Sequence, residues 1–233
     1  MELISLHIPK TGGTAFRILL QSVYGARELL FDYEDKIGRS DSRFHTDFVG
    51  WQRDNERHIC EIASRTRAVH GHFWAGKYLP YFPKARKIVW LRDPTRLLIS
   101  AYFYWKRTRP EWHPVYQVVS EKGLSPLQFA ALPDVQNPVT SRFLKGYGIG
   151  DFDFVGIMEH FAEDVEDLCE WMGWPKINVP VVNKTVSADY AQFEFDEQAV
   201  DQIRAYNSSD VVFYNAALER RHERRERLRS RSS

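Results

Sequence analysis

Four short, mostly apolar runs punctuate the chain, at residues 3–8, 68–73, 88–91 and 154–158. Runs of this length, bounded by proline, glycine or charged residues, are typical of strands that are buried on both faces of a sheet. Apolar residues at helical spacing occur between and after these runs, at residues 16–23, 54–64, 161–172, 196–206 and 209–227. The alternation predicts an α/β fold in which helices flank a central, mainly parallel sheet.

The chain contains no repeat and no linker that would divide it, so we expect residues 1–233 to form a single domain. Residues 34–43 are charged and contain glycine, which predicts a surface loop. No apolar run approaches the length of a membrane span, and the first strand begins at Leu3, so we expect neither a transmembrane segment nor a signal peptide.

The turn after the first apolar run is suited to binding phosphate. Residues 10–14 read KTGGT and connect this run, which Pro9 ends, to a helical segment that includes Phe16. Two glycines allow backbone N–H groups to converge on an anion, the helix N-terminus adds partial positive charge, and the lysine and threonine side chains supply further donors. The lysine precedes the glycines, whereas in nucleoside triphosphatases it follows them. A helix-initiating turn with an incidental lysine is the alternative interpretation.

A pair of histidines provides candidate chemistry. The sequence HGH at residues 70–72 places His70 and His72 on one face of a strand, if the segment is extended. Histidine has a pKa close to neutrality and can take a proton from a hydroxyl group. Zinc ligation is the weaker alternative, because no nearby Cys, His or carboxylate completes a recognisable set of ligands. Without further information, two structural histidines are the simpler interpretation.

The apolar run at residues 88–91 leads into a second candidate anion site. Asp93 and Pro94 have the form of a helix start, with aspartate as N-cap and proline as first residue, and Ser125 predicts another start further on. Arg92 therefore lies at the carboxyl end of a strand, where open α/β sheets bind ligands. Ser100 follows on the predicted helix, within reach of the same anion. An ordinary ion pair of Arg92 is the alternative.

Composition and charge narrow the class of protein. The hydrophobic content of 43% and aromatic content of 14% indicate a globular fold, and the formal charge of +1 gives no overall basic field for nucleic acid. Residues 220–233 are Arg-rich, with seven arginines and two glutamates from Arg220 to Arg231, so that the rest of the chain carries 25 basic and 29 acidic residues. We expect this end to be a solvated helix that frays; an RNA- or membrane-binding tail is the alternative.

The number and spacing of the cysteines indicate the redox environment of the protein. Cys60 and Cys169 lie far apart and form no C-x-x-C pair, which predicts free, buried thiols in a reducing, cytoplasmic environment. A single disulfide between them is the alternative.

Three of these segments together resemble one known family. The sequence PKTGGTAF after a hydrophobic strand resembles the 5′-phosphosulfate loop of sulfotransferases that use 3′-phosphoadenosine 5′-phosphosulfate (PAPS), and HIPKTG at residues 7–12 is similar to the heparan sulfate 2-O-sulfotransferase branch, sulfotransferase family 2. HGH followed by an aromatic residue resembles the same branch. RDPTRLLIS, residues 92–100, resembles the 3′-phosphate motif, and the segments follow in the family's order.

The resemblance implies a P-loop-like sulfotransferase fold and a role for each segment. His72 would be the catalytic base, His70 would help to orient acceptor or base, and Arg92 and Ser100 would hold the 3′-phosphate. The 5′-phosphosulfate would lie against the loop residues Lys10, Thr11, Gly12, Gly13, Thr14 and Ala15, with Lys10 also stabilising charge on the bridging oxygen. Residues 136–144 resemble a family segment near cofactor and acceptor. A late basic loop makes Lys184 and Thr185 candidate phosphate or adenine contacts, with an exposed turn as the alternative.

The reaction that follows from the resemblance is transfer of the sulfuryl group of PAPS to an acceptor hydroxyl, without a metal ion. The lack of an N-terminal anchor suggests a soluble bacterial-type member, which puts heparan sulfate itself in doubt; a carbohydrate hydroxyl is the first expectation, and a lipid or small metabolite is the alternative. Two other classes of protein stay open. One is a nucleotide kinase or triphosphatase with a variant loop, and the other is a non-catalytic nucleotide-binding protein.

Overall fold

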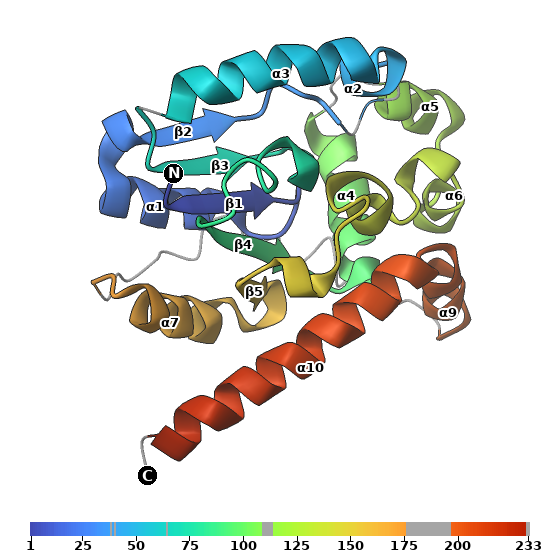
Figure 1. The fold of residues 1–233 in the computed structure, drawn as a ribbon. Coiled ribbons are helices and arrows are strands. Elements are labelled where there is room, and N and C mark those ends of the chain that lie inside the picture. The colour runs from blue at the N-terminus through green and yellow to red at the C-terminus, as the bar shows by residue number, and fades with distance from the viewer. Residues whose placement is uncertain (38, 40, 64, 109–113, 176–196, 232–233) are drawn as a thin grey trace.

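Five parallel strands form the central sheet of the computed structural model, which describes residues 1–37, 39, 41–63, 65–108, 114–175 and 197–231 (Figure 1). The strands are β1 (Leu3–His7), β2 (Leu29–Asp32), β3 (Ala68–Gly71), β4 (Arg86–Leu91) and β5 (Phe154–Ile157). Their order is β2-β3-β1-β4-β5, and every pairing is parallel. The predicted α/β fold with a mainly parallel sheet is confirmed.

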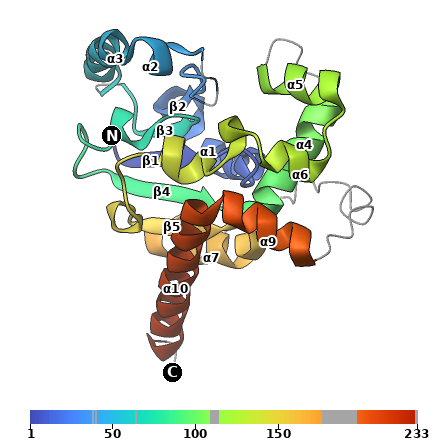
Figure 2. The ribbon, with the colours of Figure 1, turned by 90° about the vertical axis from the view of Figure 1, so that its right-hand side faces the viewer.

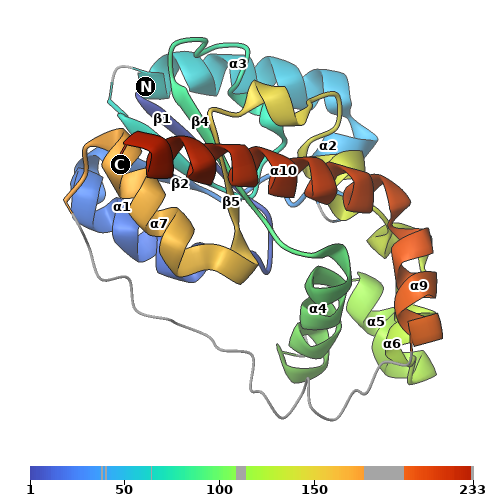
Figure 3. The same ribbon diagram turned by 90° about the horizontal axis from the view of Figure 1, so that it is seen from below.

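Helices cover both faces of the sheet and its carboxyl edge. They are α1 (Gly13–Glu28), α2 (Arg43–Thr46), α3 (Phe48–Ala63), α4 (Pro94–Thr108), α5 (Pro114–Lys122), α6 (Pro126–Ala130), α7 (Phe161–Met172), α9 (Glu197–Tyr206) and α10 (Ser208–Arg231). Shorter turns of 3-10 helix lie at Ala75–Lys77, Pro133–Val135, Ile149–Asp151 and Met158–His160, and a π-helical turn lies at Val139–Phe143. The sheet separates α3 from α1 and α7 (Figure 3), while α4, α5, α6 and α9 gather beyond the strand ends (Figure 2).

Strand β4 explains why the apolar runs show no alternation. Its side chains point to the two faces in turn, so that Ile88 and Trp90 pack with α1 and α7, whereas Val89 and Leu91 pack on the opposite face. All four are at most 2% exposed. Burying each such side chain stabilises the fold by about 1.5–3 kcal/mol. A sheet covered on both sides therefore requires the continuous runs seen in the sequence.

Two predicted helix starts are confirmed by their contacts. Helix α4 begins at Pro94, and the Asp93 carboxylate accepts a hydrogen bond of 3.0 Å from the backbone N–H of Arg96. Helix α6 begins with a reciprocal cap, in which the Ser125 hydroxyl accepts from the Gln128 N–H and the Gln128 side chain accepts from the Ser125 N–H. Both caps satisfy N–H groups that a helix leaves without partners.

The expected surface loop at residues 34–43 is partly wrong, because this segment sends two side chains inward. Asp35 and Ile37 are buried. The Lys77 ammonium, 3% exposed, lies 2.8 Å from the Asp35 carboxylate and 2.7 Å from that of Asp32. A buried lysine is tolerated only with such partners. No local pattern in the sequence indicates this pairing, because Lys77 lies about 40 residues further along the chain.

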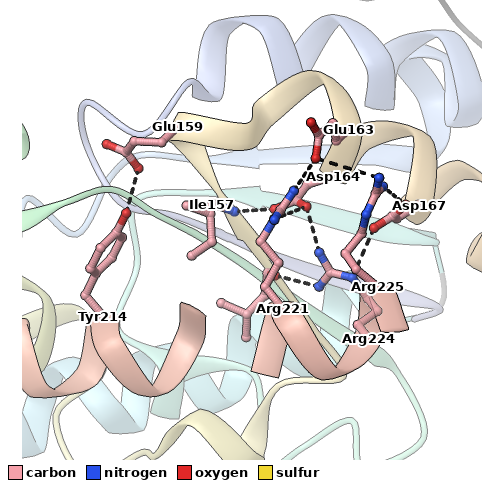
Figure 4. A network of polar contacts seen from close by, with 10 residues as sticks. Ile157, Glu159, Glu163, Asp164, Asp167, Tyr214, Arg221, Arg224 and Arg225 are labelled. Carbon is pink, nitrogen blue, oxygen red and sulfur yellow. Dashed lines mark hydrogen bonds and ion pairs between the residues drawn. The ribbon is translucent and has the colours of Figure 1, made fainter. Parts of the chain in front are cut away.

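The expectation of a fraying, solvated arginine tail is wrong for three arginines of α10, whereas Arg227 and Arg229 are exposed as expected. Arg221, Arg224 and Arg225 of α10 point toward acidic side chains of α7 (Figure 4). Arg221 and Arg224 lie 2.7 and 2.8 Å from the Asp164 carboxylate, and Arg225 lies 2.6 Å from Asp167. The arginines recur at i, i+3 and i+4, so one helical face carries them all.

Asp164 occupies the centre of this network. Its side chain is 0% exposed, and it also accepts a hydrogen bond of 2.8 Å from the Ile157 N–H at the end of β5 (Figure 4). One buried carboxylate thus connects α10, α7 and the sheet.

Cys169 on α7 is buried and forms no disulfide, as predicted. Among the described residues, no helix is long and apolar enough to cross a membrane.

Replacing this carboxylate tests the network. Asp164→Ala leaves Arg221 and Arg224 without their shared partner, so we expect the free energy of unfolding to fall by about 3–5 kcal/mol. Chemical denaturation at constant pH measures the change. The matched control is Glu163→Ala, because the Glu163 side chain is 54% exposed and pairs with Arg221 on the surface, where ion pairs contribute little. Equal effects of the two substitutions contradict the central role of Asp164.

Candidate functional site

The carboxyl ends of the strands surround a cavity of about 570 Å³. Its lining includes a residue at or just after each strand: His7 for β1, Tyr33 for β2, His72 for β3, Arg92 for β4 and Met158 for β5. The cavity lies where the strand order changes direction, because β1 stands between β3 and β4. Ligands of open α/β sheets bind at such a position, and the volume is typical of sites for small molecules.

The turn between β1 and α1 has the backbone of an anion-binding loop. Lys10 and Gly12 adopt left-handed conformations, with φ of 72° and 84°. Alternation of left- and right-handed residues turns successive N–H groups toward one point. The helix that follows has no acidic residue in its first turn, and the first N–H groups of a helix have no partner within it. Backbone dipoles and helix therefore favour negative charge at this point of the cavity.

The side chain of Lys10 lies inside the cavity. Its ammonium lies over the ring of Tyr104, 4.3 Å from the ring centre. Burial, together with the charges of Arg107 and Arg92, lowers the pKa of Lys10 to about 8. An anion bound beside Lys10 would reverse this shift, because it stabilises the charged form.

Arg92 connects the loop to the next strand. It follows β4, lines the cavity and donates a hydrogen bond of 3.1 Å to the backbone carbonyl of Lys10. Ser100, two turns along α4, lines the same cavity and is 1% exposed. The two predicted anion sites thus lie in one cavity, joined by a direct contact between Arg92 and the glycine turn.

The histidine pair meets a third histidine that the sequence did not indicate. His72 Nε2 lies 3.1 Å from His7 Nδ1, and the ring of His70 stacks on that of His7 at 5.1 Å between centroids. His70 is buried and bonds to the Ser5 hydroxyl at 2.9 Å. The backbone N–H of His72 donates a hydrogen bond of 2.8 Å to the backbone carbonyl of Asp32. The two strands can approach this closely because residue 71 is glycine, since a Cβ there would lie 1.7 Å from the same carbonyl oxygen.

Burial keeps all three imidazoles neutral near pH 7. It lowers the pKa of His72 to about 4, with the Asp32 carboxylate opposing the shift, and that of His70 to about 3. The pKa of His7 also lies well below its usual value, because of burial and the neighbouring His72, His70 and Lys10. A neutral imidazole carries a lone pair and can accept a proton, so His72 has the charge state that a general base requires.

The structure separates the predicted site residues into three groups. Those that line the cavity are Lys10, Gly12, Gly13, Thr14, His72, Arg92 and Ser100. Thr11, Ala15 and His70 do not line it. Thr11 instead donates from its hydroxyl to the Ile8 carbonyl at 2.8 Å, which holds the turn. Lys184 and Thr185 lie outside the described residues, so their assignment stays a prediction.

Residues 136–144 divide between the cavity and a helix contact. Arg142 and Phe143 line the cavity, and the ring of Phe143 lies 6.5 Å from that of His72. The Asn137 side chain instead accepts from the Ser209 and Asp210 N–H groups, while the Asp210 carboxylate accepts from the Val139 and Thr140 N–H groups. These hydrogen bonds, which run in both directions, fix the start of α10 against the segment that carries Arg142.

His7, Tyr33 and Arg39 also line the cavity, although they were not predicted to do so. The sequence contained a usable signal for His7, which ends an apolar strand at the position where an open sheet binds ligands.

Among the described residues, no cluster of His, Cys, Asp or Glu has the arrangement of a metal site. The arrangement brings together cationic donors for anions and a neutral imidazole that can take a proton.

The fold resembles that of solved sulfotransferases. One is the crystal structure of a sulfotransferase from Alicyclobacillus acidocaldarius, with a TM-score of 0.53, 15% sequence identity, and coverage of 94% of this chain and 96% of that chain. Another is mouse sulfotransferase SULT7A1 complexed with PAP, with a TM-score of 0.40, 11% identity, and coverage of 90% of this chain and 65% of that chain. No family model and no curated protein matches the chain. The similarity to the first structure shows that this chain has the α/β fold of a sulfotransferase.

Titration of the histidines tests their environment. At about pH 5.5, roughly one unit below the ordinary pKa of histidine, we expect His70 and His72 to be neutral, because burial places their pKa values near 3 and 4. Nitrogen-15 NMR of the imidazoles measures the protonation state, with His70→Asn and His72→Gln giving the assignments. Midpoints near the ordinary value for both residues contradict the buried arrangement.

Proposed function

We propose that this protein is a PAPS-dependent sulfotransferase that transfers a sulfuryl group to an acceptor hydroxyl. The observation that carries the proposal is the convergence, in one cavity, of the glycine turn with Lys10, of Arg92 with Ser100, and of the neutral His72. These groups come from three separate segments of the sequence, each of which resembles a sulfotransferase motif. The fold of a sulfotransferase supports the same function.

The donors present match the two anionic ends of PAPS. The left-handed turn at Lys10 and Gly12 offers converging N–H groups for the 5′-phosphosulfate, with Gly13 and Thr14 at the start of the helix. Arg92 and Ser100 offer a guanidinium and a hydroxyl for the 3′-phosphate. The hydroxyl and the backbone N–H of Thr11 both donate to the Ile8 carbonyl, so we assign Thr11 to holding the turn.

In the proposed reaction, PAPS supplies the sulfuryl group on a phosphate leaving group. His72 takes the proton of the acceptor hydroxyl as the acceptor oxygen bonds to sulfur and the bond from sulfur to the bridging oxygen breaks. The electron pair of that bond stays on the phosphate of adenosine 3′,5′-bisphosphate. Lys10 stabilises the charge that develops on the bridging oxygen. An anion bound in the cavity raises the pKa of His72 above its value near 4, which strengthens the base when it is needed.

A carbohydrate hydroxyl is the acceptor that we propose, on the similarity of HIPKTG and HGH to the heparan sulfate 2-O-sulfotransferase branch. Lys184 and Thr185 complete the proposed cofactor contacts. We place the protein in the cytoplasm on its cysteine content, and we treat residues 1–233 as one domain.

The kinase alternative is less well supported by the cavity. A kinase or triphosphatase needs a carboxylate for magnesium. The carboxylates among the described lining residues belong to Asp134 and Asp210. Asp210 accepts three hydrogen bonds from Val139 and Thr140, and Asp134 lies 3.8 Å from the Arg142 guanidinium. Both carboxylates therefore have protein partners.

Calorimetric titration with adenosine 3′,5′-bisphosphate tests the cofactor. We expect Lys10→Ala and Arg92→Ala each to weaken binding by about 10–100-fold, since each removes a charged donor to phosphate. The matched control is Arg96→Ala, because Arg96 lies on α4 but is exposed and does not line the cavity. Preference for ATP with Mg²⁺, or binding unaffected by either substitution, contradicts the proposal.

His72→Gln tests the base separately from the cofactor site. With radiolabelled PAPS and a panel of carbohydrate, lipid and small-molecule hydroxyl compounds, we expect kcat on the preferred acceptor to fall by about 10²–10⁴-fold. Affinity for adenosine 3′,5′-bisphosphate should stay as in the unmodified protein. His160→Gln removes an exposed histidine outside the cavity and serves as control. Full activity of His72→Gln, or no transfer to any compound of the panel, contradicts the assignment.

A further inference from the structure

His7 has no role in the reaction described so far, although it lines the cavity between the proposed base and the proposed phosphosulfate loop. Its Nδ1 lies 3.1 Å from His72 Nε2. The ring also packs against Gly13, where a Cβ would lie 1.8 Å from Cε1 and Nε2 of His7 and 2.3 Å from its Nδ1. His7 therefore contacts both the proposed base and the glycine turn.

The ring of His7 is held firmly in this place. It stacks on the buried His70, with 10° between the ring planes, and the ring of Tyr33 stands nearly perpendicular to it, with 6.4 Å between the ring centroids. His70 is in turn fixed by its bond to Ser5. A stack that leads back into the core restricts rotation of His7 and so keeps its Nδ1 directed at His72.

The contact between His7 and His72 contains a single hydrogen. When both rings are neutral, one nitrogen of the contact donates and the other accepts. The outer nitrogen of the donating ring then carries a lone pair, and the outer nitrogen of the accepting ring carries a hydrogen. The pair therefore presents one proton acceptor and one proton donor, and the position of a single hydrogen decides which residue is which.

The proposed role of His72 as the base selects one of these two forms. Because His72 Nε2 faces His7 Nδ1, His72 can take the acceptor proton only on its other nitrogen, Nδ1, which must then carry the lone pair. His72 Nε2–H is therefore the donor, and His7 Nδ1 is the acceptor. The neutral His7 ring carries its own hydrogen on Nε2.

We propose that His7 is a positioning residue for sulfuryl transfer: by accepting the Nε2–H of His72 it fixes the ring and tautomer in which His72 Nδ1 can take the acceptor proton. The inference rests on the proposed function for its chemistry, but the hydrogen bond itself does not depend on that function. When His72 Nδ1 takes the proton, His72 becomes an imidazolium whose Nε2–H still donates to His7. No second proton moves, and the lone pair of His7 stabilises the new charge.

The hydrogen bond can be observed directly by NMR. In the full-length protein with adenosine 3′,5′-bisphosphate, we expect a nitrogen–nitrogen correlation through the hydrogen bond from His72 Nε2 to His7 Nδ1, with the hydrogen attached to His72. His7→Phe, which retains the ring and its stacking on His70, should abolish it. A hydrogen attached to His7 Nδ1, or no correlation in the unmodified protein, overturns the inference whether or not the protein proves to be a sulfotransferase.

Three substitutions then separate the two nitrogens in the transfer assay. His7→Asn retains a polar atom near the position of Nδ1, His7→Gln retains one near Nε2, and His7→Phe retains neither. We expect kcat to fall by about 10–100-fold for Gln and Phe, with partial rescue by Asn and unchanged affinity for adenosine 3′,5′-bisphosphate. His160→Gln again serves as control. Equal losses for Asn, Gln and Phe, or a loss that appears in cofactor affinity, overturn the positioning role.

Discussion

The parallel register of β1 against β3 is the constraint on which the candidate site depends. Ser5 lies opposite His70 and Leu6 lies opposite Gly71. The same register brings His7, the next residue of β1, beside His72, the next residue after Gly71. A slip of one residue would turn the side chains of one strand to the other face of the sheet and separate the histidines. The packing that fixes the sheet therefore also fixes the spacing of the imidazoles.

The far side of the cavity depends on how α10 is held at both ends. Near its start, Asn137 and Asp210 exchange hydrogen bonds between the helix and the segment that carries Arg142. Near its end, arginines reach buried carboxylates of α7 (Figure 4). Between them, Glu159 accepts from the Asp93 N–H, just after β4, and from the Tyr214 hydroxyl of α10. Glu159 thus connects the start of α4 to α10.

The electrostatics of the site separate two tasks within one cavity. The Lys10 and Arg92 side chains line the part of the cavity where the backbone also favours an anion. At the neighbouring ends of β1 and β3, burial keeps the imidazoles of His7, His70 and His72 neutral. Groups whose environments drive their charge states apart are suited to different steps of one reaction. In the proposed reaction, the cations would bind the sulfuryl donor and the imidazole would receive the proton.

The sequence by itself determined the fold class, the positions of strands β1, β3, β4 and β5 and the local motifs, because buried strands, glycine turns and helix caps are set by residues close together in the chain; β2 was not predicted. Lys10 and Arg92 were predicted as anion-binding residues in this way, and His72 was predicted as a base from the resemblance to a family motif. Only the tertiary structure decided that Lys77 is paired inside the protein, that three arginines of α10 pair with acidic residues of α7, and that His7 contacts His72. Each of these contacts joins residues about 40–65 positions apart, and periodicity carries no information about partners at that separation. The register of the sheet and the docking of α10 supply it.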